Sequence, residues 1–385
     1  MKKITDYGIQ ILESLFLIFQ TSRSHAPAWE CSTDALRRSR NDIARDKSRH
    51  IDRHRIADYR LQILTFLLVF FLTITNSYAQ LFPVLGGQRA GISALQFLKI
   101  GAGARAIGMG ESFVAVANDA SSLFYNPAGA VQSPSHQIHF SHTEWLVDLQ
   151  HEFGAAIYKL SASDAVGVSV ISLHTDDMKV TTETQPFGTG QYFQYGDFAI
   201  GATYSRRFTE QFSFGITVKY VEESLAELKM RGVMVDLGTY YWTGLGSTRF
   251  AVAVTNFGSQ VSPSGSVRNL RGETIDAFQE FSPPTQFRIG FAFEPVQEEM
   301  HRLTTSIQLN HPNDNSENVG LGVEYAWNNM LFARAGYKFN VDEESFSAGA
   351  GFVAPVSFTT IQADYAFADF GRIGGVHRIS MTIGF

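Results

Sequence analysis

Apolar and polar residues alternate along most of the chain, and the last stretch shows the pattern most clearly. Ile379, Met381, Ile383 and Phe385 are apolar, and small or polar residues separate them. Successive side chains of a strand point to opposite faces, so this segment predicts a strand with one apolar face. Pairing it with the first strand would leave the sheet no open edge. Ending on an aromatic residue is typical of outer-membrane β-barrels, which makes Phe385 a candidate signal for the barrel assembly machinery.

The same alternation recurs in about fourteen segments, an even number as bacterial single-chain barrels require. Each is close to the ~9–11 residues that a tilted strand needs to cross a bilayer. The segments lie near 137–143, 148–159, 165–174, 198–208, 212–223, 232–243, 248–256, 285–294, 302–310, 318–327, 330–338, 345–353, 356–366 and 375–385. The sequence therefore predicts an all-β membrane protein, an antiparallel ~14-stranded outer-membrane β-barrel over residues 136–385.

The lengths of the connections support this prediction, because outer-membrane barrels have short periplasmic turns and longer external loops. Short connections are expected at 161–164, 209–211, 243–247, 328–329 and 354–355. Longer connections are expected to alternate with the short ones, at 175–197, 223–231, 257–284, 311–317 and 368–374. The connections 295–301 and 341–344 do not follow this alternation of lengths. We expect both termini in the periplasm.

Charged residues within the alternating segments fall on one face only. A charge facing lipid at mid-bilayer costs ~2–4 kcal/mol, so Lys219, Arg288, Glu324 and Asp364 are expected to face the lumen. Glycine is frequent on the same face. This predicts a crowded interior that holds a plug rather than an open pore.

The first 79 residues are set apart from the fold. Arginines precede an apolar run over Leu61–Thr75, and small residues at Ser77 and Ala79 precede Gln80. This order predicts a signal peptide over 56–79, cut between Ala79 and Gln80, with 1–55 a non-native extension or disordered. The rest holds 19 Lys and Arg against 29 Asp and Glu, a balance that argues against nucleic-acid binding. Its partners are expected to include outer-membrane lipid.

Residues 80–135 differ in character and are expected to form a periplasmic lead-in and a plug with a small helix. The glycines of 101–110 indicate close backbone packing, since no lysine of a phosphate loop follows them. Glu111–Asn118 has strand character. Asp119 is the expected N-cap of a short helix over 121–125 that Asn126 and Pro127 end.

This stretch resembles the PorV/PorQ family of outer-membrane proteins, within the FadL-like barrels. The matching residues are Gly103, Ala104, Arg105, Gly108, Gly110, Asp119, Ala120, Asn126, Pro127 and Gly129. The resemblance implies a 14-stranded barrel with an N-terminal plug. It also implies either a role in type IX secretion, in which the barrel carries cargo proteins, or passage of hydrophobic small molecules such as fatty acids.

No residue pattern points to catalysis, and we expect neither an enzyme nor a cofactor. His136, His139 and His142 are three residues apart, so on a strand they cannot converge on a metal. Asp176 and Asp177 could bind calcium but suit a solvated loop. The sequence contains no nucleophile elbow, zinc-protease motif or phosphate loop.

The two longest connections, 175–197 and 257–284, are expected to be external and rich in apolar residues. Loops of this length are usually functional or disordered. Their aromatic residues are the candidate partner contacts: Phe187, Tyr192, Phe193, Phe278 and Phe281. The favoured function is the handling of cargo proteins and other components of type IX secretion. A channel for hydrophobic molecules and a purely structural barrel are the alternatives.

Overall fold

The computed structural model describes residues 91–268 and 272–385, which all belong to one unit of the chain, residues 82–385. The predicted signal peptide, its cleavage site at Ala79 and Gln80, and the extension 1–55 lie outside the described residues. Within the described part, no helix is both long and apolar enough to cross a membrane.

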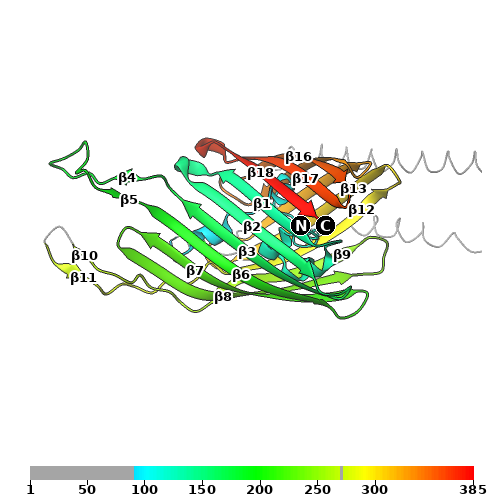
Figure 1. The fold of residues 1–385 in the computed structure, drawn as a ribbon, viewed down its shortest axis with the longest axis horizontal. Helices are drawn as coiled ribbons and strands as arrows, with labels where there is room; N and C mark the ends of the chain where they lie inside the picture. The colour runs from blue at the N-terminus through cyan, green and yellow to red at the C-terminus, as the bar shows by residue number, and fades with distance from the viewer. Residues whose placement is uncertain (1–90, 269–271) are drawn as a thin grey trace, which may run out of the picture. The chain divides into compact units, whose positions relative to one another are not determined.

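Fourteen antiparallel strands form a closed barrel, as the alternation predicts (Figure 1). The wall strands are β1 (Gln137–Glu144), β2 (Gln150–Lys159), β3 (Asp164–His174), β6 (Tyr195–Arg207), β7 (Phe212–Leu225), β8 (Leu228–Trp242), β9 (Arg249–Gly258), β12 (Gln286–Gln297), β13 (His301–Pro312), β14 (Asn318–Trp327), β15 (Leu331–Phe339), β16 (Phe346–Val356), β17 (Thr359–Asp369) and β18 (Gly375–Gly384). The last strand pairs with the first, from Gln137 opposite Gly384 to Glu144 opposite His377, so the expected closure is confirmed.

The connections fall into two sets that define two ends of the barrel. The short-turn end carries residues 160–163, 208–211, 243–248, 298–300, 328–330 and 357–358, together with Phe385. The long-loop end carries 145–149, 175–194, 226–227, 259–285, 313–317, 340–345 and 370–374. Two hairpins project from the long-loop end, β4 (Met178–Lys179) with β5 (Tyr192–Phe193) and β10 (Val267–Arg268) with β11 (Thr274–Ile275) (Figure 1). Short 3-10 helices, η3 (Leu146–Asp148) and η4 (Gly371–Ile373), lie in two other loops.

One expected loop proved to be strand. Residues 223–231 were predicted as a longer connection, but β7 and β8 continue to a two-residue turn at 226–227. Glu222, Lys229 and Arg231 lie on the outer surface here, so the polar–apolar alternation that identifies a bilayer-crossing strand is lost although the pairing continues. The irregular connection at 295–301 is also shorter than expected, because β12 passes a register shift and runs to Gln297.

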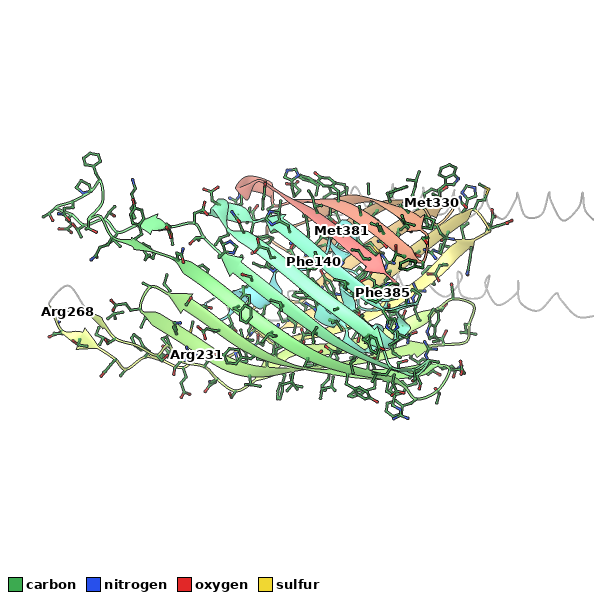
Figure 2. All side chains as sticks on the ribbon, viewed as in Figure 1. Phe140, Arg231, Arg268, Met330, Met381 and Phe385 are labelled. Carbon is green, nitrogen blue, oxygen red and sulfur yellow. The ribbon has the colours of Figure 1, made fainter. Side chains whose placement is uncertain are left out.

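Side chains of the wall alternate between lumen and exterior. The charges expected inside, Lys219, Arg288, Glu324 and Asp364, are all buried. Outward positions are apolar and exposed, as Phe140 and Met381 show in Figure 2. Glu324 and Arg334 face each other across β14 and β15, so the inward face joins opposite charges between neighbouring strands.

Residues 92–135 fill the lumen and form the plug. Its helices are η1 (Gln96–Lys99), α3 (Ala104–Gly108), α4 (Ser122–Tyr125) and η2 (Pro127–Gln132), and nearly all residues from Gly101 onward are buried. The stretch 111–118 was expected to have strand character, but it contains turns and no strand. Residues 113–117 are buried, so apolar residues are needed there, and the side chain of Gln308 accepts hydrogen bonds from the backbone N–H groups of Phe113 and Val114.

The plug runs from one end of the barrel to the other. Gln96 and Lys99 bind Asp314 at the long-loop end, whereas Lys159, which ends β2 at the short-turn end, donates to the carbonyls of Val131 and Ser133. The first described residues and the C-terminus therefore lie at opposite ends. The N-terminus itself lies outside the described residues, so the placement of both termini on one side stays a prediction.

Candidate functional site: the plugged lumen

Glycines of the wall let the plug backbone approach the strands. A Cβ atom on Gly336 of β15 would lie 2.0 Å from the backbone nitrogen of Gly110, and one on Gly322 of β14 would lie 2.5 Å from the Met109 carbonyl oxygen. On the opposite wall, a Cβ on Gly215 of β7 would lie 2.3 Å from the Pro127 carbonyl carbon. Such distances leave no room for a side chain. The crowded interior expected from the inward glycines is therefore confirmed.

A chain of five charged side chains fixes α3 to one side of the barrel. Arg105 binds Asp119 at 2.7 Å within the plug and Glu324 of β14 at 2.9 Å. Glu324 binds Arg334 of β15 at 2.7 Å, and Arg334 binds Asp364 of β17 at 2.7 Å. Positive and negative charges alternate, so each inner member has a partner on both sides. We call these residues the ion-pair chain.

Burial and charge act in opposite directions on the plug members of this chain. Burial would raise the pKa of Asp119, but Arg105 and, less strongly, His139 hold it below its ordinary value. Burial likewise opposes the charged form of Arg105, while Glu324 and Asp119 raise its pKa above the ordinary value. The plug therefore keeps both groups ionised inside the barrel.

A second polar cluster lies toward the long-loop end. Lys338 of β15 contacts Glu111 of the plug at 3.1 Å and Glu344 of the 340–345 loop at 2.6 Å. Burial tends to raise the pKa of both carboxyls, and Lys338 brings only that of Glu111 below its ordinary value, whereas that of Glu344 stays raised. Two carboxyls thus share one ammonium, and Glu344 is the one more easily protonated.

Asn126 joins the plug to the opposite wall without charge. Its side-chain amide donates to the carbonyls of Val114 at 3.0 Å and Thr239 of β8 at 3.1 Å. Its oxygen accepts from the backbone N–H of Ala128 at 3.1 Å, which begins η2. Asn126 and Pro127 end α4 as predicted, whereas Asp119 lies two residues before the N-cap Ser121 and accepts from its N–H.

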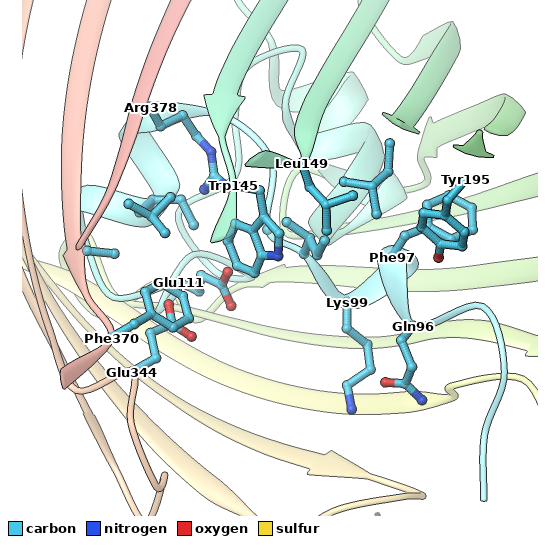
Figure 3. Close-up of a pocket in the computed structure, with 16 residues that line it drawn as sticks. Gln96, Phe97, Lys99, Glu111, Trp145, Leu149, Tyr195, Glu344, Phe370 and Arg378 are labelled. Carbon is cyan, nitrogen blue, oxygen red and sulfur yellow. The ribbon is translucent and has the colours of Figure 1, made fainter. Parts of the chain in front are cut away.

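Two cavities of about 400 Å³ each flank the plug. The loop-end cavity is lined by rings of Phe97, Trp145 and Phe370 and by Leu149, with Arg378 reaching in from β18 (Figure 3). Arg378 is buried and donates to Thr143 at 2.5 Å, but its Nη2 has no hydrogen-bond partner among the described residues. This cavity can hold an apolar group next to a cation.

The turn-end cavity is more polar. Its walls include Arg105, Arg302 and Glu324, with Trp242 beside Arg249, whose guanidinium lies 5.3 Å from the indole ring. Arg249 also binds Glu294 at 2.8 Å. The ion-pair chain therefore reaches the wall of this cavity, and the plug separates it from the loop-end cavity.

The structure brings the predicted plug residues together and spreads the others. Gly103, Gly108, Gly110 and Gly129 lie buried in the plug with Asp119, Asn126 and Pro127, and Arg105 is half-buried among them. The aromatic residues of the long loops lie in or beside the hairpins: Phe187 and Tyr192 are exposed, and Phe193, Phe278 and Phe281 are half-buried.

The three histidines of β1 take different partners. His139 binds Thr382 inside the barrel, His142 binds Glu152 outside, and His136 accepts from the backbone of Lys159. Sequence reasoning did not identify Arg334 and Arg378 as site residues, because their partners lie on other strands. Strand register was the signal that could have paired Arg334 with Glu324.

Several solved structures resemble the chain at low identity. The toluene transporter TbuX of Ralstonia pickettii is 13% identical with a TM-score of 0.48, over 74% of this chain and 97% of that one. A FadL homologue of Pseudomonas aeruginosa is 11% identical with a TM-score of 0.48, over 74% and 98%. The toluene transporter TodX of P. putida is 12% identical with a TM-score of 0.46, over 74% and 96%.

The sequence itself identifies a family. No curated protein matches the chain. Residues 86–312, more than half of its length, match the family described as type IX secretion system protein PorV. The matched region contains the plug, with its ion-paired Arg105, and the wall from β1 to β13. The chain therefore belongs to the PorV family and is an outer-membrane β-barrel.

Proposed function

We propose that this protein holds secreted cargo proteins at its long-loop end during type IX secretion. The observation that carries the proposal is the pair of hairpins that extend past the barrel wall there. Phe187, in the loop between β4 and β5, is 95% exposed, and Tyr192 at the start of β5 is also exposed. Large exposed apolar groups on a projecting segment mark a contact surface for a protein. Membership of a family named for this secretion system supports the same function.

The plug supports surface handling rather than transit through the lumen. Arg105 is ion-paired to the wall, and Gly110 and Pro127 lie against wall glycines on opposite sides. Passage of a folded protein would require breaking the ion-pair chain and the Asn126 contacts together. In this proposal the long-loop end faces the exterior, the short-turn end faces the periplasm, and other secretion components contact the same outer loops.

A pull-down tests this function. The tagged protein is extracted in detergent from its own outer membrane, and co-purifying proteins are identified by mass spectrometry. We expect secreted proteins that share a C-terminal domain, together with other secretion components. Replacing Phe187, Tyr192 and Phe278 by serine should reduce their recovery at least fivefold. A control variant with serine at the exposed Thr181 and Thr184, in the same hairpin as Phe187, should retain them. A barrel that emerges alone contradicts the proposal.

The loop-end cavity favours a second candidate, a channel for hydrophobic molecules with an acidic head. Arg378 offers an unpaired N–H beside aromatic rings, which suits a fatty acid whose chain packs on Trp145 and Phe370. Native mass spectrometry of the detergent-purified barrel would detect such a ligand. We expect Arg378→Gln to lower its occupancy at least threefold. Equal occupancy in the variant, or no ligand in either, argues against the channel.

A further inference from the structure

Every turn at the short-turn end exposes one large apolar side chain. The six residues are Leu160, Phe208, Leu245, Met300, Met330 and Phe358. Phe358 is 86% exposed and Leu245 76% exposed, although both lie in tight connections where polar residues are usual. We call this set the apolar rim. Met330 and Phe385 lie toward this end in Figure 2, opposite Arg231 and Arg268.

The distribution around the barrel indicates what covers the apolar rim. The six turns connect twelve strands, so the exposed side chains surround the whole opening rather than one sector. A docked protein needs a patch on one side, whereas a bilayer surrounds every strand equally. The connections at this end also contain three acidic residues, Glu210, Glu298 and Glu299, and no basic residue. This charge suits zwitterionic phospholipid rather than an anionic surface.

The height of the apolar wall leads to the same conclusion. On β7 the outward residues are apolar or aromatic from Phe212 to Tyr220, and Glu222 is the first charge. Ten residues that advance ~3.4 Å each along a strand tilted by about 40° span about 26 Å along the barrel axis. This height is close to the ~25 Å apolar band of such barrels. Glu222 is bound outside the wall by Lys229 at 3.1 Å and Arg231 at 2.8 Å, as expected for residues above the hydrocarbon.

Three strands further around the barrel, the wall leaves still less room. On β2 the first outward charge is Glu152, which binds His142 at 3.2 Å and His174 at 3.4 Å. Only eight residues separate it from Leu160 in the turn, a rise of about 21 Å with the same geometry. Even counted up to Leu160 in the turn, the apolar band here is shorter than the usual ~25 Å, so the bilayer must extend to the turn on this part of the wall.

We propose that the apolar rim is a lipid-binding surface, whose six side chains insert into the lipid–water interface of a zwitterionic phospholipid leaflet. The bilayer is then flush with the turns at this end. All extra strand length, including the ends of β6, β7 and β8, projects from the membrane at the other end with the hairpins. The inference depends on the barrel being in the outer membrane and is independent of what the hairpins bind.

Spin labels test the position of the rim. Single cysteines replace Leu245 or Phe358 in the full chain carrying Cys31→Ser, and the labelled protein is reconstituted in phosphatidylcholine vesicles. Ile379→Cys, on the outward face of β18, is the lipid reference, and Phe187→Cys is the water reference. Collision rates with oxygen, which concentrates in lipid, and with a water-soluble nickel chelate report depth.

We expect the oxygen-to-nickel ratio at both rim sites to exceed that at Phe187 at least threefold and to approach that at Ile379. A ratio equal to that at Phe187 would overturn the proposal, because these vesicles contain no protein that could cover the rim. If a label prevents assembly, seen as loss of the heat-modifiable band, Phe208 and Met300 serve as alternative positions with the same expected ratio.

Discussion

The plug is fixed to two sides of the barrel by different kinds of contact. The α3 side depends on charge, with Arg105 held between Asp119 and the wall residue Glu324. The η2 side depends on the neutral Asn126 amide and on backbone packed against Gly215. A buried ion pair is costly to break, because the remaining partner is left charged and unpaired. On the charged side, a substitution that removes one partner should therefore lower the free energy of unfolding far more than a pair of substitutions that removes both partners.

Removing Arg105 gives the largest expected effect. Arg105→Met leaves Asp119 and Glu324 without the guanidinium they share, and breaking a buried pair costs ~3–5 kcal/mol of unfolding free energy. Urea unfolding in detergent, followed by tryptophan fluorescence, measures the loss. Adding Asp119→Asn should recover at least half of it, because Glu324 keeps Arg334 as its partner. Arg372→Met, at an exposed pair with Glu343, is the control and should leave the midpoint unchanged. Equal losses in both single variants contradict the comparison.

Closing the gap between wall and plug should have the next largest effect. A methyl group on Gly336 would meet the backbone of Gly110, which itself has a left-handed conformation with φ of 61° and cannot easily move. We expect Gly336→Ala to cost about 3 kcal/mol and to make the plug accessible to protease. Gly154→Ala on β2 is the control, since its new methyl would lie 3.8 Å from the Phe140 ring. The idea fails if both alanines are tolerated alike.

The sequence predicted the wall better than the lumen. Alternation located each strand because inward and outward faces meet different environments, and it failed at 222–231, where the outward face carries charges above the bilayer. The plug glycines could be recognised by their spacing. Arg334 and Asp364 could not be paired, because residues 30 positions apart meet only through the register of β15, β16 and β17.

The neutral anchor should be less sensitive than the charged one. Asn126→Ala removes the donors to the buried carbonyls of Val114 and Thr239, and we expect a loss of about 2 kcal/mol. Asn126→Asp retains the acceptor for Ala128 but places a negative charge against two carbonyl oxygens, so it should be worse than alanine. Thermal unfolding by circular dichroism ranks the two. If aspartate proves the milder change, the amide is not acting as a donor here.

The smallest expected effect is a change in pH dependence that separates charge from packing. Arg105 outweighs burial and lowers the pKa of Asp119 in the folded state. The ionised Asp119 therefore contributes stability above its unfolded pKa of about 3.9, and this contribution is lost as pH falls through the lower folded pKa. Without Arg105, burial dominates, the folded pKa lies above the unfolded one, and protonation favours the folded state. The deficit of Arg105→Met relative to the parent should therefore shrink as pH is lowered from 7 toward 4, whereas the deficit of Gly336→Ala should stay constant. Urea midpoints of the three proteins at each pH measure this difference. Parallel curves for both variants would show that Arg105 acts by filling space rather than by its charge.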